Sequence, residues 1–178
     1  GQGKYTSSWL PSIDDMNEKA EFDLNFEFPV SYELIANGEN ISSEIINDSV
    51  RQWKFNMEEP MSSYLVGFAA GKYHSKTITS TSGIEIQNFY LPQDSLLLEP
   101  TYRHSAEIMD FFEQEIGIEY PWTNYKQIPV SDFLYAGMEN TGTTIFSESL
   151  MVDSIGYHDQ NYVNVNAHEL AHQWFGNL

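Results

Sequence analysis

Large apolar residues alternate with polar ones along much of the first half of the chain. Between residues 21 and 28 every second side chain is Phe or Leu, and acidic or amide side chains stand between them. This period of two is typical of a half-buried antiparallel strand. The pattern recurs at residues 32–36, which lead into the turn-forming pair Asn37-Gly38, and again at residues 53–57. We therefore expect an antiparallel sheet with one buried face.

Two more segments extend the predicted β structure. Residues 64–70 form a short apolar run, which we interpret as a buried strand. The pair Ser82-Gly83 favours a hairpin between residues 77–79 and residues 84–90. The first half of the chain is thus predicted to be all-β.

The period of the pattern changes in the second half. Apolar side chains recur at helical spacing over residues 102–116, with Pro100 in the first turn and Gly117 placed to end the helix. Strand-like segments follow at residues 125–130 and 143–146. This mixture of periods indicates both helices and strands.

The sequence as a whole predicts an α+β protein with two parts. Residues 1–92 are expected to form an antiparallel, β-sandwich-like module. Residues 93–178 are expected to form a mixed module that contains the candidate chemistry.

Charge and composition exclude several classes of partner. The 178 residues carry 26 acidic against 8 basic side chains, a net charge of −18, which disfavours nucleic acids and anionic membrane surfaces. Lys126 is the last cation in the chain, so the acidic residues after it are unopposed and would attract a metal ion or a substrate ammonium group. A solubility surface explains most of these carboxylates equally well.

Other sequence features say less about the cellular compartment and the oligomeric state of the protein. No apolar run approaches the roughly 20 residues of a membrane-spanning helix, so we expect a soluble protein without a membrane span. The absence of Cys suits cytoplasm and periplasm alike, and the oligomeric state is left open. Gly1 begins the chain without an initiator Met or an apolar leader, so we interpret the chain as an internal piece of a longer protein.

The sequence His-Glu-Leu-Ala-His at residues 168–172 carries the main candidate chemistry. Residues four apart on a helix project from one face, so His168 and His172 can bind one zinc ion. Glu169 can reach a water activated by that metal without binding the metal itself, as a metallopeptidase general base does. A chance match in a chain with five His is rare, at roughly one sequence in a hundred.

The surrounding pattern supports a helix at this motif. Asp159 is a candidate N-cap and Gly176 a candidate C-terminal stop. An apolar stripe lies between them, formed by Tyr162, Val163, Ala167, Leu170 and Trp174. The alternative is that the two His belong to a solvated helix face without function.

Two His do not complete a zinc site, because such sites normally have at least three protein ligands. His74, His104 and His158 are the internal candidates, but nothing in their spacing recommends them. His158 would lie about 15 Å from His168 along the same predicted helix. We therefore expect the third ligand to be absent from this chain.

The motifs together resemble one family of zinc metallopeptidases. Residues 135–140, Tyr-Ala-Gly-Met-Glu-Asn, resemble the Gly-x-Met-Glu-Asn exopeptidase signature of the aminopeptidase N family of gluzincins, which includes leukotriene hydrolase. Residues 168–178 are similar to its His-Glu-x-x-His-x-Trp-x-Gly-Asn-Leu block. Residues 9–15 and 60–65 resemble segments of its N-terminal β domain. The resemblance spans nearly the whole chain.

This resemblance implies a fold and a chemistry. Residues 93–178 would be the first half of a thermolysin-like catalytic domain that removes N-terminal residues from peptides. His168 and His172 would bind Zn²⁺, and Glu169 would be the base that activates water.

The resemblance also implies how substrate is held. Glu139 would bind the free α-amino group, and the backbone of Ala136 and Gly137 would pair with the peptide as an edge strand. Gln2 falls where the family lines its first substrate subsite. Without its neighbouring motif, Glu139 would be interpreted as a solvated or salt-bridged strand residue.

The family's further ligand, a Glu on the next helix, and its Tyr that stabilises the tetrahedral intermediate would both lie beyond Leu178. We therefore expect the 178-residue chain to be inactive by itself. Two alternatives stay open: hydrolysis of a lipid epoxide at the same zinc, and a non-catalytic binding module on the same fold.

Overall fold

The computed structural model describes residues 5–178, so the subsite residue Gln2 lies outside the described part. Five strands form the N-terminal β module. β1 (Lys19–Pro29), β4 (Val50–Ser62) and β3 (Glu39–Asn47) form an antiparallel sheet in the order β1-β4-β3. β2 (Glu33–Ala36) pairs antiparallel with β5 (Phe68–Gly71).

The predicted alternation is confirmed in both long strands of this module. In β4 the side chains of Trp53, Phe55 and Met57 are at most 3% exposed, and in β1 Leu24 is buried. Burial of these side chains removes apolar surface from water, and this stabilises the packing of the sheet on its core. β3 was not predicted, because its side chains are nearly all exposed and show no apolar period.

A second, five-stranded sheet has the order β6-β7-β8-β10-β9. The strands are β6 (His74–Thr79), β7 (Glu85–Tyr90), β8 (Asn124–Val130), β9 (Gly137–Met138) and β10 (Thr143–Ser147). The predicted β6–β7 hairpin is confirmed, and β8 runs parallel to both β7 and β10.

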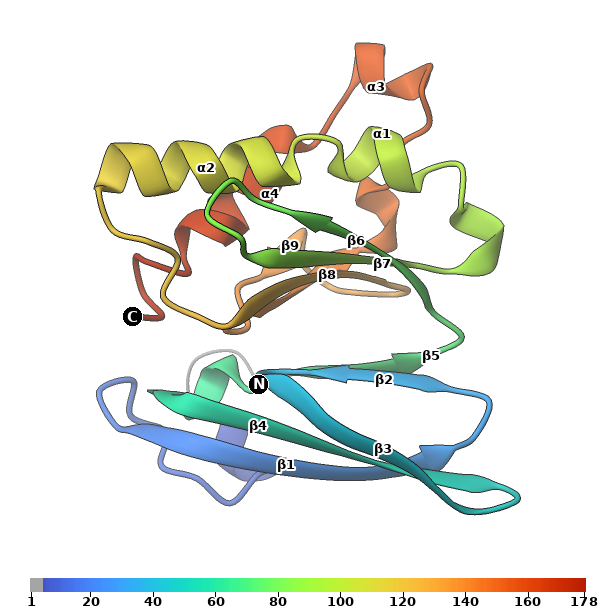
Figure 1. Cartoon of the computed structure of the whole chain (residues 1–178), viewed down its shortest axis with the longest axis vertical. Helices are drawn as coiled ribbons and strands as arrows, with labels where there is room; N and C mark the ends of the chain where they lie inside the picture. Colours follow the sequence, from blue (N-terminus) through green and yellow to red (C-terminus); the bar gives the residue numbers. More distant parts are fainter. Residues whose placement is uncertain (1–4) are drawn as a thin grey trace.

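Four α-helices accompany this sheet: α1 (Leu98–Tyr102), α2 (Ser105–Ile116), α3 (Gly156–Asp159) and α4 (Val163–Ala171). The five-stranded sheet lies between α1, α2 and α4 on one side and the β module on the other (Figure 1). The α+β class is thereby confirmed. Within residues 5–178, no helix has the length and apolar character needed to cross a bilayer.

One hydrophobic cluster joins the β module to the five-stranded sheet and to helix α4. Trp53 of the β module, Tyr125 of β8 and Leu170 of α4 belong to the same cluster, and each is at most 2% exposed. The helix with the His-Glu-x-x-His motif is therefore fixed by the same core as the sheet. Close packing of this kind transmits small displacements between the layers.

Two predictions of local structure were wrong. Asp159 is the last residue of α3, and Gln160 after it is extended, so α4 begins separately with Tyr162 at its N-cap. The helix also ends at Ala171, before the predicted stop at Gly176. By contrast, Gly117 does end α2, in the left-handed conformation with φ 73°.

The predicted buried strand over residues 64–70 was wrong in its first half. Ser63–Leu65 form a 3₁₀ turn, and β5 begins only at Phe68. The carbonyl of Leu65 and the N–H of Gly67 bond to the side-chain amide of Asn37 instead of to a neighbouring strand. A polar side chain placed elsewhere in the sequence thus interrupts the strand.

The division of the chain at residue 93 stays a prediction. β6 and β7 precede that position but belong to the five-stranded sheet, because β7 pairs with β8. We infer that a division between β5 and β6 agrees better with the sheet pairing.

Candidate metal centre and peptide-binding edge

His168 and His172 lie on α4 and at its C-terminal cap, and their rings approach each other. The two Nε2 atoms are 3.2 Å apart, and the ring planes are nearly perpendicular. Two nitrogens bound tetrahedrally to one zinc ion at 2.0–2.1 Å would be separated by about 3.3 Å. The pair therefore fits two adjacent positions of a zinc site.

A backbone contact fixes the tautomer of His172. Its Nδ1 lies 3.0 Å from the carbonyl oxygen of Phe175, which can only accept, so Nδ1–H is the donor. Nε2 of the neutral ring then carries a lone pair directed at His168. Hydrogen bonds of this kind to the second ring nitrogen orient metal-binding His residues.

Within residues 5–178, no group of three or more His, Asp or Glu side chains is arranged to hold a metal ion. His104 bonds instead to Glu107 and to the hydroxyl of Tyr157. His74 packs its ring against Tyr90, and His158 packs against Tyr157. These three His thus have other partners.

Glu169 lies one residue after His168 and is 6% exposed. A Cβ atom added to Gly137 would come within 2.5 Å of Glu169 Oε1, so the carboxyl group lies directly against the backbone of β9. The α4 helix and the β9 strand thereby present the Glu169 carboxyl group and a strand backbone at one place.

The environment of Glu169 favours its protonated form. Burial, and after it the nearby Glu139 carboxylate, raise the pKa of Glu169 to about 7, against a smaller opposite effect of His172. A carboxyl group with a pKa near neutrality can both take up and release a proton, which is the property of a general base or acid.

The strand β9 is the outermost strand of the five-stranded sheet. It pairs with β10 through Met138 and Gly137, and the carbonyl of Ala136 accepts a hydrogen bond from the N–H of Ser147. Because hydrogen-bonded and non-hydrogen-bonded pairs alternate in an antiparallel ladder, the N–H and C=O of Gly137 point away from β10. No strand within residues 5–178 pairs with this outer side.

Glu139 follows β9 directly and is half-buried. Its backbone is held by the turn after α4: its carbonyl accepts from Asn177 Nδ2 at 2.8 Å and from Gln173 Nε2 at 3.4 Å. Gln173 also accepts from the N–H of Gly142 at 2.9 Å. The two motifs are therefore hydrogen-bonded to each other.

Neither Gln173 nor Asn177 was given a role from the sequence. Both are 0% exposed although both are amides. Gln173 stands in the helical motif next to the apolar Trp174, so a polar residue at a buried helical position was the available signal.

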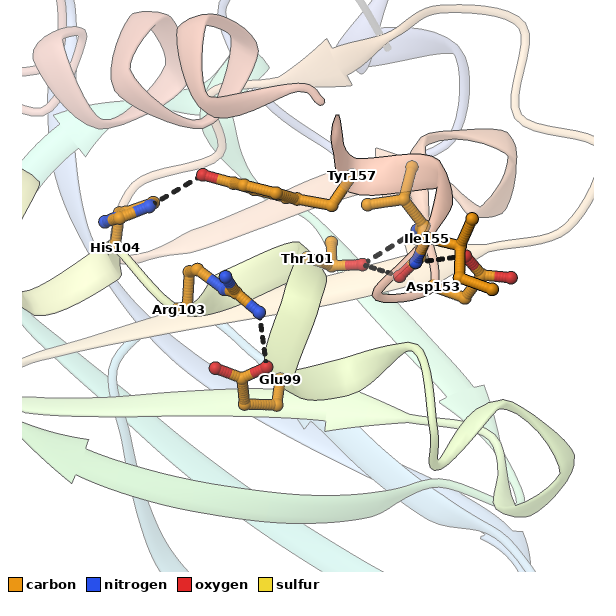
Figure 2. A network of polar contacts seen from close by, with 8 residues as sticks. Glu99, Thr101, Arg103, His104, Asp153, Ile155 and Tyr157 are labelled. Atoms are coloured by element: carbon orange, nitrogen blue, oxygen red, sulfur yellow. Dashed lines mark hydrogen bonds and ion pairs between the residues drawn. The ribbon is translucent and has the colours of Figure 1, made fainter. Parts of the chain in front are cut away.

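The segment between β10 and α4, which includes α3, is held by a polar network to residues 101–104, in and just after α1 (Figure 2). His104 Nε2 lies 2.8 Å from the Tyr157 hydroxyl, and Arg103 lies over the Tyr157 ring. The carbonyl of Thr101 accepts from Asn166 of α4 at 3.1 Å. These contacts set the start of α4, and with it the direction of the His-bearing face.

Comparison with known sequences identifies the class of protein. The profile of the peptidase M1 N-terminal domain matches residues 1–65, and the profile of the peptidase family M1 domain matches residues 101–178. The chain belongs to peptidase family M1.

Individual relatives agree with this class. The chain is 31% identical over 173 residues to a glutamyl aminopeptidase of Sus scrofa and 32% identical over 175 residues to an aminopeptidase N of Lactococcus lactis subsp. lactis. Each match covers 95% of this chain but only 18% and 20% of the respective relative. The chain thus spans about a fifth of the length of these relatives.

Proposed function

We propose that the whole protein is a zinc-dependent aminopeptidase that removes N-terminal residues from peptides. One observation carries the proposal: Glu169, which stands beside the His168–His172 pair on one helix, lies with its carboxyl group against the backbone of β9 at Gly137, and Glu139 is close enough to raise its pKa. An extended peptide on this edge would pass both carboxylates.

Each residue has a distinct proposed role. Gly137 pairs through its backbone N–H and C=O with the substrate backbone, as an added strand does. Glu139 binds the substrate ammonium group and so limits the cleaved part to the N-terminal residue. Glu169 takes a proton from the attacking water and delivers it to the leaving amine.

His168 and His172 would hold the zinc ion, together with a ligand that the described residues do not supply. Bound zinc supplies Lewis-acid polarisation of the scissile carbonyl and of the attacking water. The carbonyl of Phe175 keeps His172 in the tautomer that leaves Nε2 free to bind.

The electrostatics of the site favour a cationic substrate end. Glu139 and Glu169 are close enough that the first raises the pKa of the second. The chain carries no Lys or Arg after Lys126. A free ammonium group beside Glu139 would reduce the repulsion between the two carboxylates and favour ionised Glu169.

The test uses the whole protein with three substrate classes: aminoacyl anilides, the same anilides with an acetylated N-terminus, and a lipid epoxide. We expect turnover of the free-amine anilides, loss of turnover on treatment with a chelator, and recovery on addition of zinc. A series that includes glutamyl and neutral residues would establish the side-chain preference.

Two results would contradict the proposal. Turnover of the epoxide alone would indicate a different chemistry at the same metal. Stoichiometric zinc without hydrolysis of any anilide would indicate a binding module.

A further inference from the structure

The β2–β3 turn of the β module contacts the loop between β9 and β10 through Asn37. This side chain is 0% exposed and makes three hydrogen bonds. Nδ2 donates to the carbonyl of Thr141 at 2.7 Å and to the carbonyl of Leu65 at 3.1 Å, and Oδ1 accepts from the N–H of Gly67 at 2.8 Å. One amide thus connects two segments of the β module to the loop after Glu139.

A second amide strengthens this connection. Asn140 Nδ2 donates to the same Leu65 carbonyl at 3.1 Å. Both residues that follow Glu139 are therefore tied to the β module, Asn140 by its side chain and Thr141 by its carbonyl. Buried hydrogen bonds of this kind define one backbone position, because an unmade bond leaves a buried polar group unpaired.

The turn that carries Asn37 is itself held on both sides. Lys126 Nζ donates to the carbonyl of Ala36 at 2.9 Å and to the carbonyl of Gly38, and Thr143 Oγ1 donates to Ala36 at 3.1 Å. Gly38 has φ 76°, and a Cβ there would collide with the backbone of Asn56. The turn is therefore a fixed support for the Asn37 side chain.

We propose that Asn37 is a positioning residue for the substrate amine: it fixes the backbone after Glu139 and thereby the place of the Glu139 carboxylate. The inference rests on the proposed function, in which Glu139 binds the ammonium group. It assigns to the β module a part in substrate binding, although Asn37 itself does not touch substrate.

The test is the KM of the whole protein for an aminoacyl anilide. A role in stability alone would lower the fraction of active protein and therefore the maximal rate, but it would leave KM unchanged. We expect Asn37→Ala and Asn37→Asp, which both remove the Nδ2 donors, to raise KM about three- to tenfold at unchanged zinc content. Asn25→Ala, at an exposed position of β1, is the matched control and should leave KM unchanged.

Asn37→Ser keeps a small buried polar group and is assayed as well, in case the Ala variant does not yield folded protein. An unchanged KM in the folded Asn37 variants overturns the proposal. So does an equal rise of KM in the Asn25→Ala control.

A double-mutant cycle with Glu139→Ala separates this inference from the proposed function. If Asn37 acts through Glu139, Asn37→Ala should not raise KM further in the Glu139→Ala background. Independent, multiplying effects would show that Asn37 acts elsewhere and would overturn the inference. If Glu139→Ala alone leaves KM unchanged, the amine-binding role of Glu139 is itself wrong.

Discussion

Gly137 and Glu169 lie so close together that a Cβ atom on Gly137 would come within 2.5 Å of Glu169 Oε1. They belong to β9 and α4 and lie about thirty positions apart in the chain, and they bring a strand backbone and a buried carboxyl group together. A peptide paired with β9 would therefore have its backbone beside Glu169, which is the arrangement that a general base requires.

The first prediction separates the base from the metal ligands. In the whole protein, Glu169→Gln should abolish turnover and leave the zinc content near stoichiometric, because the amide keeps the shape but cannot take a proton. His168→Ala and His172→Ala should instead lose zinc. Metal analysis beside anilide hydrolysis measures both effects, and an empty site in Glu169→Gln would show that the roles are assigned wrongly.

The second prediction concerns selectivity for a free N-terminus. A partly desolvated contact between ammonium and carboxylate contributes about 1.5–3 kcal/mol, or roughly one to two factors of ten in affinity. Glu139→Ala should therefore raise KM and lower turnover without loss of zinc. The Glu139→Ala variant should also discriminate less than the wild type between peptides with free and with acetylated N-termini. Equal activity of the wild type on both kinds of peptide would exclude Glu139 as the group that binds the amine.

A third prediction applies to the 178-residue chain alone. Among residues 5–178 no third His, Asp or Glu joins His168 and His172 in a metal-binding group, so we expect weak zinc binding and essentially no peptidase activity. Equilibrium dialysis against zinc, followed by an anilide assay, measures both. Zinc retained through long dialysis, with turnover close to that of the whole protein, would refute this expectation.

The fourth prediction is a pH dependence of stability at Lys126. Burial lowers the pKa of this ammonium group from its ordinary 10.5 to about 7, and Glu39 opposes the shift only in part. Between these two values the unfolded state binds more protons than the folded state, so the free energy of unfolding rises with pH.

Lys126→Met removes this titration while keeping most of the side-chain volume. The stability of the wild type relative to the variant should increase from pH 7 towards pH 10, by at most about 1.4 kcal/mol per pH unit. Denaturant unfolding of both proteins over this range measures the difference. A difference that is constant or falls with pH would contradict the assignment.

The fifth prediction compares two glycines with positive φ. Gly38 has φ 76° and its Cβ would meet the backbone of Asn56, whereas Gly83 has φ 96° and open space around it. Gly83→Ala should cost about 1–2 kcal/mol for the left-handed conformation alone. Gly38→Ala should lower the melting temperature clearly more, and equal losses in the two variants would show that the turn adapts.

The periodic parts of the fold could be predicted from the sequence. β1, β4 and α2 have apolar side chains at the period of their structure, and each is confirmed, although Pro100 belongs to the separate helix α1 and not to the first turn of α2. The β6–β7 hairpin, predicted from the turn pair Ser82-Gly83, is confirmed as well. β3 was missed because side chains on both faces of the strand are exposed and show no apolar period. The 3₁₀ turn at Ser63–Leu65 was missed because it depends on Asn37 and Asn140, whose positions only the tertiary structure defines.

The candidate site divides in the same way. His168, Glu169 and His172 are close in sequence, so helical geometry alone placed them together. The residues that support the site from a distance could not be predicted in this way. Lys126, which holds the turn of Asn37, looks like an ordinary surface cation in the sequence, and nothing local indicates that it lies at 4% exposure among backbone carbonyls. Contacts between residues about ninety positions apart leave no local pattern.

The Asn37-Gly38 pair also has a consequence for the chemical ageing of the protein. In an Asn-Gly sequence the backbone nitrogen of the Gly readily attacks the side-chain carbonyl carbon of the Asn. Ammonia leaves, and water then opens the resulting cyclic imide to Asp or isoaspartate. In the folded protein the Asn37 amide is fully buried and held by three hydrogen bonds, which prevents that attack. In an unfolded chain the reaction is free to occur, and the resulting carboxylate would face the carbonyls of Leu65 and Thr141 on refolding. A chain that stays unfolded, above all in alkaline solution, should therefore lose the Asn37 amide. After refolding it would permanently lack the contact of Asn37 with Thr141, which joins the β module to the loop after Glu139.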